Sequence, residues 1–237
     1  MSDIAVICGA TGALGAAIVD AFVRRGDHVI AVARSRAEVT ELESRYPRRE
    51  GGGFVTGDTA DLTQRLSVDD LWERIDRVGV PRWVVNATGG FRAGTVAESR
   101  PDDFAMMLDL NLASTWWSCR AAARRMSSRA DGGRSGGIVN VSSRAAVTAD
   151  SGGAAYAVAK AGVLKLTEVL ATELKRDGVR VNCVLPWVID TPANRRTMPE
   201  KLLQKAVPPA EIAAVIAYLC SDAADAINGT AIPLYGR

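Results

Sequence analysis

The fold is decided by the stretch Ile4-Ala-Val-Ile-Cys8-Gly9-Ala-Thr-Gly12-Ala-Leu-Gly15, close to the amino terminus. Its first five residues are apolar, as in a strand that is buried on both faces of a parallel sheet. A glycine-rich turn follows, and then an apolar helix to about Arg25. In this context, backbone amides at the start of the helix can bind a pyrophosphate. We therefore predict a phosphate-binding loop at residues 9–15; the alternative is a helix-start turn without a ligand.

The next strand is predicted at His28–Ala33, and the residues after it bear on the choice of cofactor. A site that prefers NAD(H) usually has an acidic residue here to hold the ribose hydroxyls. This chain has Ala33 and then two arginines, Arg34 and Arg36. A guanidinium suits the 2′-phosphate of NADP(H). We predict that NADP(H) is preferred over NAD(H), with Arg34 as the main contact and Arg36 as a further candidate. The alternative is that both are solvated charges at a helix start.

A second stretch, from Ser143 to Lys160, carries the candidate chemistry. Tyr156 and Lys160 are four residues apart, so on a helix they share one face. An ammonium one turn away should lower the pKa of the phenol, which could then exchange a proton with a carbonyl or an alcohol. Ser143 follows the apolar run Gly137–Val141, at a strand end of the kind where open α/β sheets bind ligands. The alternative is a Tyr and a Lys on a helix face with a Ser in a turn.

Together these stretches resemble the short-chain dehydrogenase/reductase family, from Ile4 to about Leu234. The resemblance implies one Rossmann-type domain over residues 1–237: an α/β fold with a doubly wound parallel sheet of about seven strands and helices on both faces. It also implies NAD(P)-dependent hydride transfer at a carbon that bears oxygen. The implied catalytic residues are Asn111, Ser143, Tyr156 and Lys160. Asn111 would hold a water that joins Lys160 to solvent; the alternative is a buried Asn bonded to helix backbone.

The resemblance also implies a set of cofactor contacts along the chain. They are Gly9, Thr11, Gly12, Ala13, Leu14, Gly15, Arg34, Asp61, Leu62, Asn86, Ala87, Tyr156, Lys160, Pro186, Val188 and Thr191. Asp61 would contact the adenine ring, with Asp58 as a competitor for that role. Asn86 begins a segment similar to the family's Asn-Ala-Gly, although Thr88 stands where glycine is usual; a purely structural Asn86 is the alternative.

Two departures from the family pattern concern the glycine loop and the substrate side. The glycines fall at the first, fourth and seventh places of the loop, a spacing similar to that of dihydropteridine reductases. Trp187 replaces the glycine that usually follows Pro186. We predict Ser143, Tyr156 and Trp187 as substrate contacts, with Trp187 favouring flat or apolar ketones; a Trp packed under the loop is the alternative. Residues 187–208 are the candidate substrate lid.

Composition narrows the class of protein. The 237 residues are 48% hydrophobic, and the net charge of +2 gives no reason to expect nucleic acid or an anionic membrane as a partner. We expect neither a signal peptide nor a membrane span. Four widely spaced cysteines suggest reduced thiols in the cytoplasm. With one histidine, His28, we expect no His-based metal site and no Ser-His-Asp triad.

The sequence thus predicts an NADPH-dependent carbonyl reductase or alcohol dehydrogenase that acts on a small-molecule ketone or alcohol. By resemblance we expect a homotetramer or a homodimer, and the pair Trp116-Trp117 as core or subunit contact. One alternative is a dihydropteridine reductase-like activity, although those enzymes typically lack the serine at position 143. A second is a non-catalytic NADP-sensing regulator, although such proteins usually lose the Tyr or the Lys.

Overall fold

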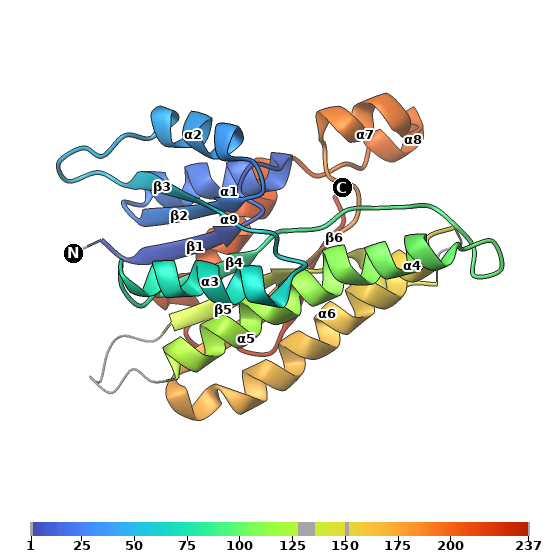
Figure 1. Ribbon diagram of the computed structural model, residues 1–237. Helices are drawn as coiled ribbons and strands as arrows, with labels where there is room; N and C mark the ends of the chain where they lie inside the picture. The colour runs from blue at the N-terminus through green and yellow to red at the C-terminus, as the bar shows by residue number, and fades with distance from the viewer. Residues whose placement is uncertain (1, 128–135, 150–151, 237) are drawn as a thin grey trace.

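The computed structural model describes residues 2–127, 136–149 and 152–236. In this part of the chain seven strands form one parallel sheet in the order β3-β2-β1-β4-β5-β6-β7 (Figure 1). The strands are β1 (Ile4–Cys8), β2 (His28–Ala33), β3 (Phe54–Thr59), β4 (Trp83–Asn86), β5 (Gly136–Val141), β6 (Val179–Pro186) and β7 (Ala231–Leu234). The order reverses between β1 and β4, which opens a crevice at the carboxyl ends of the strands. The predicted fold class is confirmed.

Helices cover both faces of the sheet (Figure 1). One layer contains α1 (Ala13–Arg24), α2 (Arg36–Arg45) and α9 (Pro209–Leu219); the other contains α3 (Arg65–Asp76), α4 (Pro101–Leu108), α5 (Ser114–Met126) and α6 (Ala154–Glu173). Two apolar clusters fill the spaces between the layers and the sheet. Two short helices, α7 (Pro192–Thr197) and α8 (Glu200–Leu203), lie apart from both layers, beyond the end of β6.

Four shorter helical turns join these elements. They are η1 (Asp109–Ala113), η2 (Arg144–Ala146), η3 (Lys175–Asp177) and η4 (Asp222–Ala224). The first is a π-helical turn, and the other three are 3₁₀ turns. The sequence predicts one long helix from Pro101 to about Met126, but η1 divides it into α4 and α5 around Asn111. Single π-turns inside helices often mark functional positions.

Of two local predictions from the sequence, one is wrong and the other lies mostly outside the described residues. Ser67 is predicted as the N-cap of its helix, but α3 begins two residues earlier, at Arg65. The Ser67 hydroxyl instead accepts a hydrogen bond from the Asp61 amide at 3.0 Å and so supports the loop before α3. The predicted loop at 127–137 falls mostly on residues 128–135, outside the described part, and β5 begins at Gly136.

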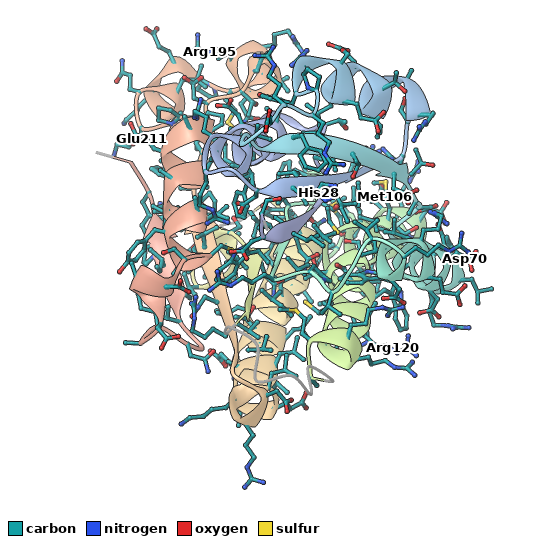
Figure 2. All side chains as sticks on the ribbon, turned by 90° about the vertical axis from the view of Figure 1, so that its left-hand side faces the viewer. His28, Asp70, Met106, Arg120, Arg195 and Glu211 are labelled. Carbon is teal, nitrogen blue, oxygen red and sulfur yellow. The ribbon has the colours of Figure 1, made fainter. Side chains whose placement is uncertain are left out.

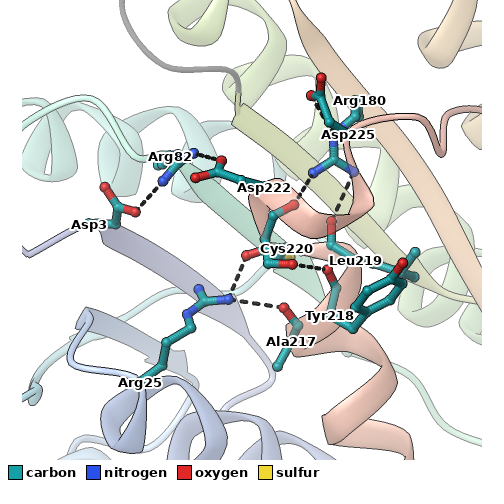
Figure 3. A network of polar contacts seen from close by, with 11 residues as sticks. Asp3, Arg25, Arg82, Arg180, Ala217, Tyr218, Leu219, Cys220, Asp222 and Asp225 are labelled. Atoms are coloured by element: carbon teal, nitrogen blue, oxygen red, sulfur yellow. Dashed lines mark hydrogen bonds and ion pairs between the residues drawn. The ribbon is translucent and has the colours of Figure 1, made fainter.

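Two arginines brace the end of the sheet where the strands begin. Arg25 donates to the carbonyls of Ala217 and Cys220, at the carboxyl end of α9 (Figure 3). The buried Arg180 donates to the carbonyls of Leu219 at 2.9 Å and Ser221 at 3.0 Å. The last carbonyls of a helix have no partner inside the helix. These arginines therefore supply the donors that let α9 end against the sheet.

We predict that Arg180→Met lowers the free energy of unfolding by about 3 kcal/mol, because it leaves buried carbonyls without donors. Urea denaturation of the wild type and the variant measures the change. The control is Arg176→Met, at an exposed position in η3, which should stay within about 0.5 kcal/mol of the wild type. Equal stability of the two variants would contradict the bracing role.

Candidate active site

A cavity of about 330 Å³ lies at the carboxyl ends of β1, β2, β3 and β4. It is lined by Gly9, Thr11, Gly12, Ala33, Arg34, Glu38, Ala60, Asp61, Leu62, Thr63, Ala87, Thr88, Gly89 and Leu110. Several predicted cofactor contacts from distant parts of the chain meet in this one cavity, which lies in the crevice where the strand order reverses. This is where doubly wound sheets bind dinucleotides.

The glycine loop has the shape that a pyrophosphate needs. Gly9 has φ +80°, and a Cβ on it would lie 2.9 Å from the Thr88 amide nitrogen. Gly12 is the N-cap residue of α1, where no side chain caps the helix and the first turn contains no acidic residue. Backbone amides and the helix dipole at this end attract an anion. Ala13 and Leu14, also predicted contacts, can reach a ligand only through their backbone amides. Ala13 has no polar side chain, and the Leu14 side chain is buried in the core.

The two arginines after β2 take different positions. Arg34 is exposed and lines the cavity. Arg36 is the first residue of α2, and its guanidinium donates to the Gly57 carbonyl at 3.2 Å, so it is bound to β3. Glu38 also lines the cavity and accepts a hydrogen bond from the Thr11 hydroxyl at 3.0 Å. The sequence analysis missed Glu38, whose only signal was the capping pattern that begins at Ser35.

The two aspartates that compete for the adenine role are separated by the structure. Asp58 is engaged by the guanidinium of Arg74, with contacts of 2.9 Å and 3.2 Å. Asp61 lines the cavity, and its carboxylate accepts from the amide and the hydroxyl of Thr63. Only Asp61 is therefore in position to face a ligand.

The Asn86 side chain does not line this cavity. It is fully buried, and its amide nitrogen donates to Asn140 Oδ1 at 2.8 Å and Cys119 Sγ at 3.3 Å. These bonds tie β4 to β5 and α5 within the core. The next residue, Ala87, lines the cavity, and a contact of Asn86 with the cofactor stays a prediction.

Ser143, Tyr156 and Lys160 come together beside the end of β5. The Ser143 hydroxyl caps η2, accepting from the Ala145 amide at 3.2 Å, and lies close enough to the Tyr156 phenol to influence its pKa. Tyr156 lies in the first turn of α6, and Lys160 lies one turn further on. The Lys160 side chain is 4% exposed, and its Nζ lies 5.8 Å from the centre of the Tyr156 ring. The three side chains thus form one cluster.

The protonation of this cluster differs from the sequence prediction. Burial raises the pKa of Tyr156 above its usual value, and the nearby Ser143 hydroxyl only partly opposes this. Burial also lowers the pKa of Lys160 to about 8. The Lys160 amine donates to the Val141 carbonyl at 2.9 Å. The predicted lowering of the tyrosine pKa is therefore wrong for this structure, because desolvation of the phenol dominates.

Asn111 is fully buried inside the π-turn η1. Its amide nitrogen donates to the carbonyls of Gly90 and Met107 at 3.1 Å and 3.0 Å, and its Oδ1 accepts from the Gly90 amide at 3.2 Å. A Cβ on Gly89 would lie 2.8 Å from Asn111 Oδ1 and 3.2 Å from Lys160 Nζ. Asn111 is thus a buried backbone-bonding residue, and it also lies next to the Lys160 amine.

The remaining predicted residues follow β6. Pro186 and Val188 are buried, and the Thr191 hydroxyl caps α7 by accepting from the Asn194 amide at 3.1 Å. Trp187 between them is partly exposed. The guanidinium carbon of Arg144 lies 4.1 Å from the centre of a Trp187 ring. Because Arg144 directly follows Ser143, the indole reaches the serine side of the cluster.

The chain's histidine lies at the other end of the sheet. His28 is the first residue of β2, stacks on Phe54 and bonds Thr56 Oγ1 at 2.8 Å. Figure 2 views the molecule toward this end, where His28 is labelled.

Among the described residues, no three His, Cys, Asp or Glu side chains gather as metal ligands. In the same part of the chain, no helix is long and apolar enough to span a membrane.

Comparisons with known proteins agree with this geometry. The profile of the short chain dehydrogenase family matches residues 3–202. A D-threitol dehydrogenase of Mycolicibacterium smegmatis is 32% identical, covering 98% of this chain and 91% of its own. A (3R)-3-hydroxyacyl-CoA dehydrogenase of Rattus norvegicus is 31% identical, covering 99% and 95%. A solved structure of a Burkholderia xenovorans protein assigned to the short-chain dehydrogenases/reductases has a TM-score of 0.88 at 30% identity, covering 99% and 95%.

The chain belongs to the short-chain dehydrogenase/reductase family. It is therefore an oxidoreductase that acts on alcohol or carbonyl groups, and its family uses a nicotinamide cofactor. The glycine loop, the uncapped start of α1 and the cavity beside them fit such a dinucleotide.

We predict that Lys160 makes the stability of the cofactor-free chain depend on pH. Its pKa is about 8 in the folded chain and 10.5 ordinarily, so between these values the unfolded chain binds more protons and stability rises with pH. Unfolding free energies by urea denaturation should show the wild type gaining on Lys160→Met by up to about 1.4 kcal/mol per pH unit in this window. Both chains share the four buried thiols, so the difference isolates Lys160.

The control for this measurement is Lys165→Met, at an exposed position of α6. The difference between the wild type and this variant should not change across the same pH window. A pH-independent difference for Lys160→Met as well would refute the lowered pKa.

Proposed function

We propose that the protein is an NADPH-dependent carbonyl reductase, or an alcohol dehydrogenase in the reverse direction, with Tyr156 as the general acid and base. The proposal rests mainly on one observation. The Ser143 hydroxyl lies close enough to the Tyr156 phenol to influence its pKa, and the buried Lys160 amine lies one helical turn from Tyr156. When bound, the nicotinamide supplies or accepts the hydride.

Each side chain of the cluster has a distinct role in this proposal. Ser143 donates a hydrogen bond to the substrate's carbonyl oxygen and orients it. Tyr156 donates the proton to that oxygen; because its pKa is raised, the phenol is protonated and ready to donate at neutral pH. Lys160, with a pKa of about 8, can return a proton near neutral pH. Asn111 lies beside Lys160 and would complete the relay to solvent.

The cofactor would lie along the carboxyl ends of the strands. Its pyrophosphate would rest on Gly9–Gly15 and its adenine near Asp61 and Leu62, which line the cavity. Arg34, at the same cavity, is the residue available to a 2′-phosphate, which supports the preference for NADP(H). Tyr156 and Lys160 would meet the nicotinamide ribose. Pro186, Val188 and Thr191 would support the nicotinamide end.

We predict that Tyr156→Phe lowers turnover of carbonyl substrates by about 1,000-fold, because it removes the proton donor. The dissociation constant for NADPH should change little, since the ring remains. Steady-state kinetics with a ketone panel and NADPH titration by fluorescence provide the two measurements. Full turnover in this variant would refute the role of Tyr156.

We predict that Arg34→Ala lowers kcat/KM for NADPH by about 30-fold and leaves kcat/KM for NADH nearly unchanged. The matched control is Arg36→Ala, because Arg36 is held on the Gly57 carbonyl; its effect should stay within about threefold. Kinetics with both cofactors measure the two ratios. A wild-type preference for NADH, or equal effects of the two variants, would contradict the assignment.

The proposal also covers the domain organisation, the oligomeric state and the location of the protein. We propose one domain over residues 1–237, with 187–208 as the substrate lid; α7 and α8 belong to this segment, which is joined to itself by the bond from the Val207 amide to Val188. Exposed apolar side chains support a homotetramer or a homodimer, and the four free cysteines support a location in the cytoplasm. Trp116 on α5 is 49% exposed, and Val158 and Val169 on α6 and Tyr218 on α9 are also exposed. Trp117 packs against the core.

A dihydropteridine reductase-like activity is the second candidate, because the glycine spacing of the loop favours it. Ser143, which lies near the Tyr156 phenol, favours the general carbonyl reductase. Turnover of quinonoid dihydropterin, compared with that of simple ketones, separates the two. A non-catalytic NADP-sensing regulator would bind NADPH but would not oxidise it in the presence of any carbonyl compound.

A further inference from the structure

The catalytic phenol has an exposed aromatic neighbour. Phe91 follows the glycines after β4, and its side chain is 62% exposed. Its ring meets the Tyr156 ring edge-on, with the centres 5.2 Å apart and an angle of 81° between the planes. Most of this phenylalanine is therefore open to solvent, while part of its ring packs against the ring of Tyr156.

The backbone around Phe91 is held in place on both sides. On one side, the buried Asn111 amide binds both the N–H and the carbonyl of Gly90. On the other, Gly94 donates to the Gly152 carbonyl at 3.0 Å and accepts from the Ala154 amide at 3.2 Å. These bonds join the segment to the start of α6, which carries Tyr156. Phe91 is thus positioned by the same elements that position the phenol.

A second apolar side chain lies on the serine side of the cluster. Val147 ends the turn that begins at Ser143, where its amide donates to the Arg144 carbonyl, and its side chain is exposed. The charged neighbour of Phe91, Arg92, is paired with Asp103 at 3.4 Å. The exposed side chains beside Tyr156 and in the turn after Ser143 thus include the apolar Phe91 and Val147. Partly exposed Trp187 adds a further aromatic ring on the serine side.

We propose that Phe91 is a specificity-determining residue of this site, and that the substrate class is ketones, or the matching secondary alcohols, with an aryl group on the reacting carbon. The aryl ring packs on the exposed face of Phe91 while the oxygen lies between Ser143 and Tyr156. Aromatic rings gain from such contacts beyond the apolar area they bury. The inference rests on the proposed function, because it takes Tyr156 as the proton donor.

The test compares acetophenone with butan-2-one, each with NADPH as the reductant. The wild type should have the higher kcat/KM for acetophenone. In Phe91→Ala this preference should fall by about tenfold, mainly through a higher KM for acetophenone, whereas the values for butan-2-one stay within about threefold. Phe91→Leu, which keeps an apolar side chain, should retain part of the preference.

Two further variants separate this role from a general loss of structure. Leu66→Ala removes an apolar side chain of similar exposure, 65%, from α3 and should leave both substrates unaffected. Gly153→Ala leaves Phe91 unaltered but brings a Cβ to 3.0 Å from its ring, so it should lower the preference as well. Thermal unfolding and NADPH affinity of all variants should match the wild type.

The outcomes distinguish the two proposals. An unchanged ratio of the two substrates in Phe91→Ala, with both still reduced, would overturn the role of Phe91 alone. A wild type that reduces butan-2-one at least as well as acetophenone would overturn the substrate class. Failure of the wild type to oxidise NADPH with any carbonyl compound would overturn the proposed function, and this inference with it.

Discussion

Two buried hydrogen bonds join α6, which carries Tyr156, to the end of β5 and the residues that follow it, including Ser143. The Lys160 amine donates to the Val141 carbonyl at 2.9 Å, and the Ser142 hydroxyl donates to the Lys160 carbonyl at 2.7 Å. Val141 ends β5, and Ser143 follows two residues later. The pair of bonds therefore sets the distance between Ser143 and Tyr156. The proposed reaction needs Ser143 and Tyr156 close together, so it depends on this junction as well as on the cofactor site at the glycine loop.

Burying an amine in this way changes its chemistry. The environment that holds Lys160 against Val141 also lowers the amine's pKa to about 8, and the same desolvation raises the pKa of the phenol. In this structure the site therefore holds a protonated tyrosine and a lysine that titrates within reach of neutral pH. This lowered pKa supports the proposal that Lys160 passes a proton rather than acting only as a fixed positive charge.

Sequence patterns predicted the elements well and the side-chain directions less well. The alternation of strand, glycine turn and helix from Ile4 to Gly15 is local, so the parallel sheet and the crevice followed from it. Asn86 shows the limit of such reasoning, because its place at a strand end matched the pattern while its side chain bonds Asn140 in the core. Arg34 and Arg36 look equivalent in sequence, yet only Arg34 lines the cavity.

The sequence by itself determined the family and the order of the elements, and it predicted which residues carry the chemistry. Those properties depend on periodicity, on glycine positions and on short spacings such as the four residues from Tyr156 to Lys160. Only the tertiary structure decided the protonation of the cluster, the contact of Glu38 with Thr11 and the placement of Phe91 beside Tyr156. The physical reason is that desolvation and side-chain contacts depend on segments far apart in the chain, such as the loop after β4 and the start of α6, and local sequence does not encode their approach.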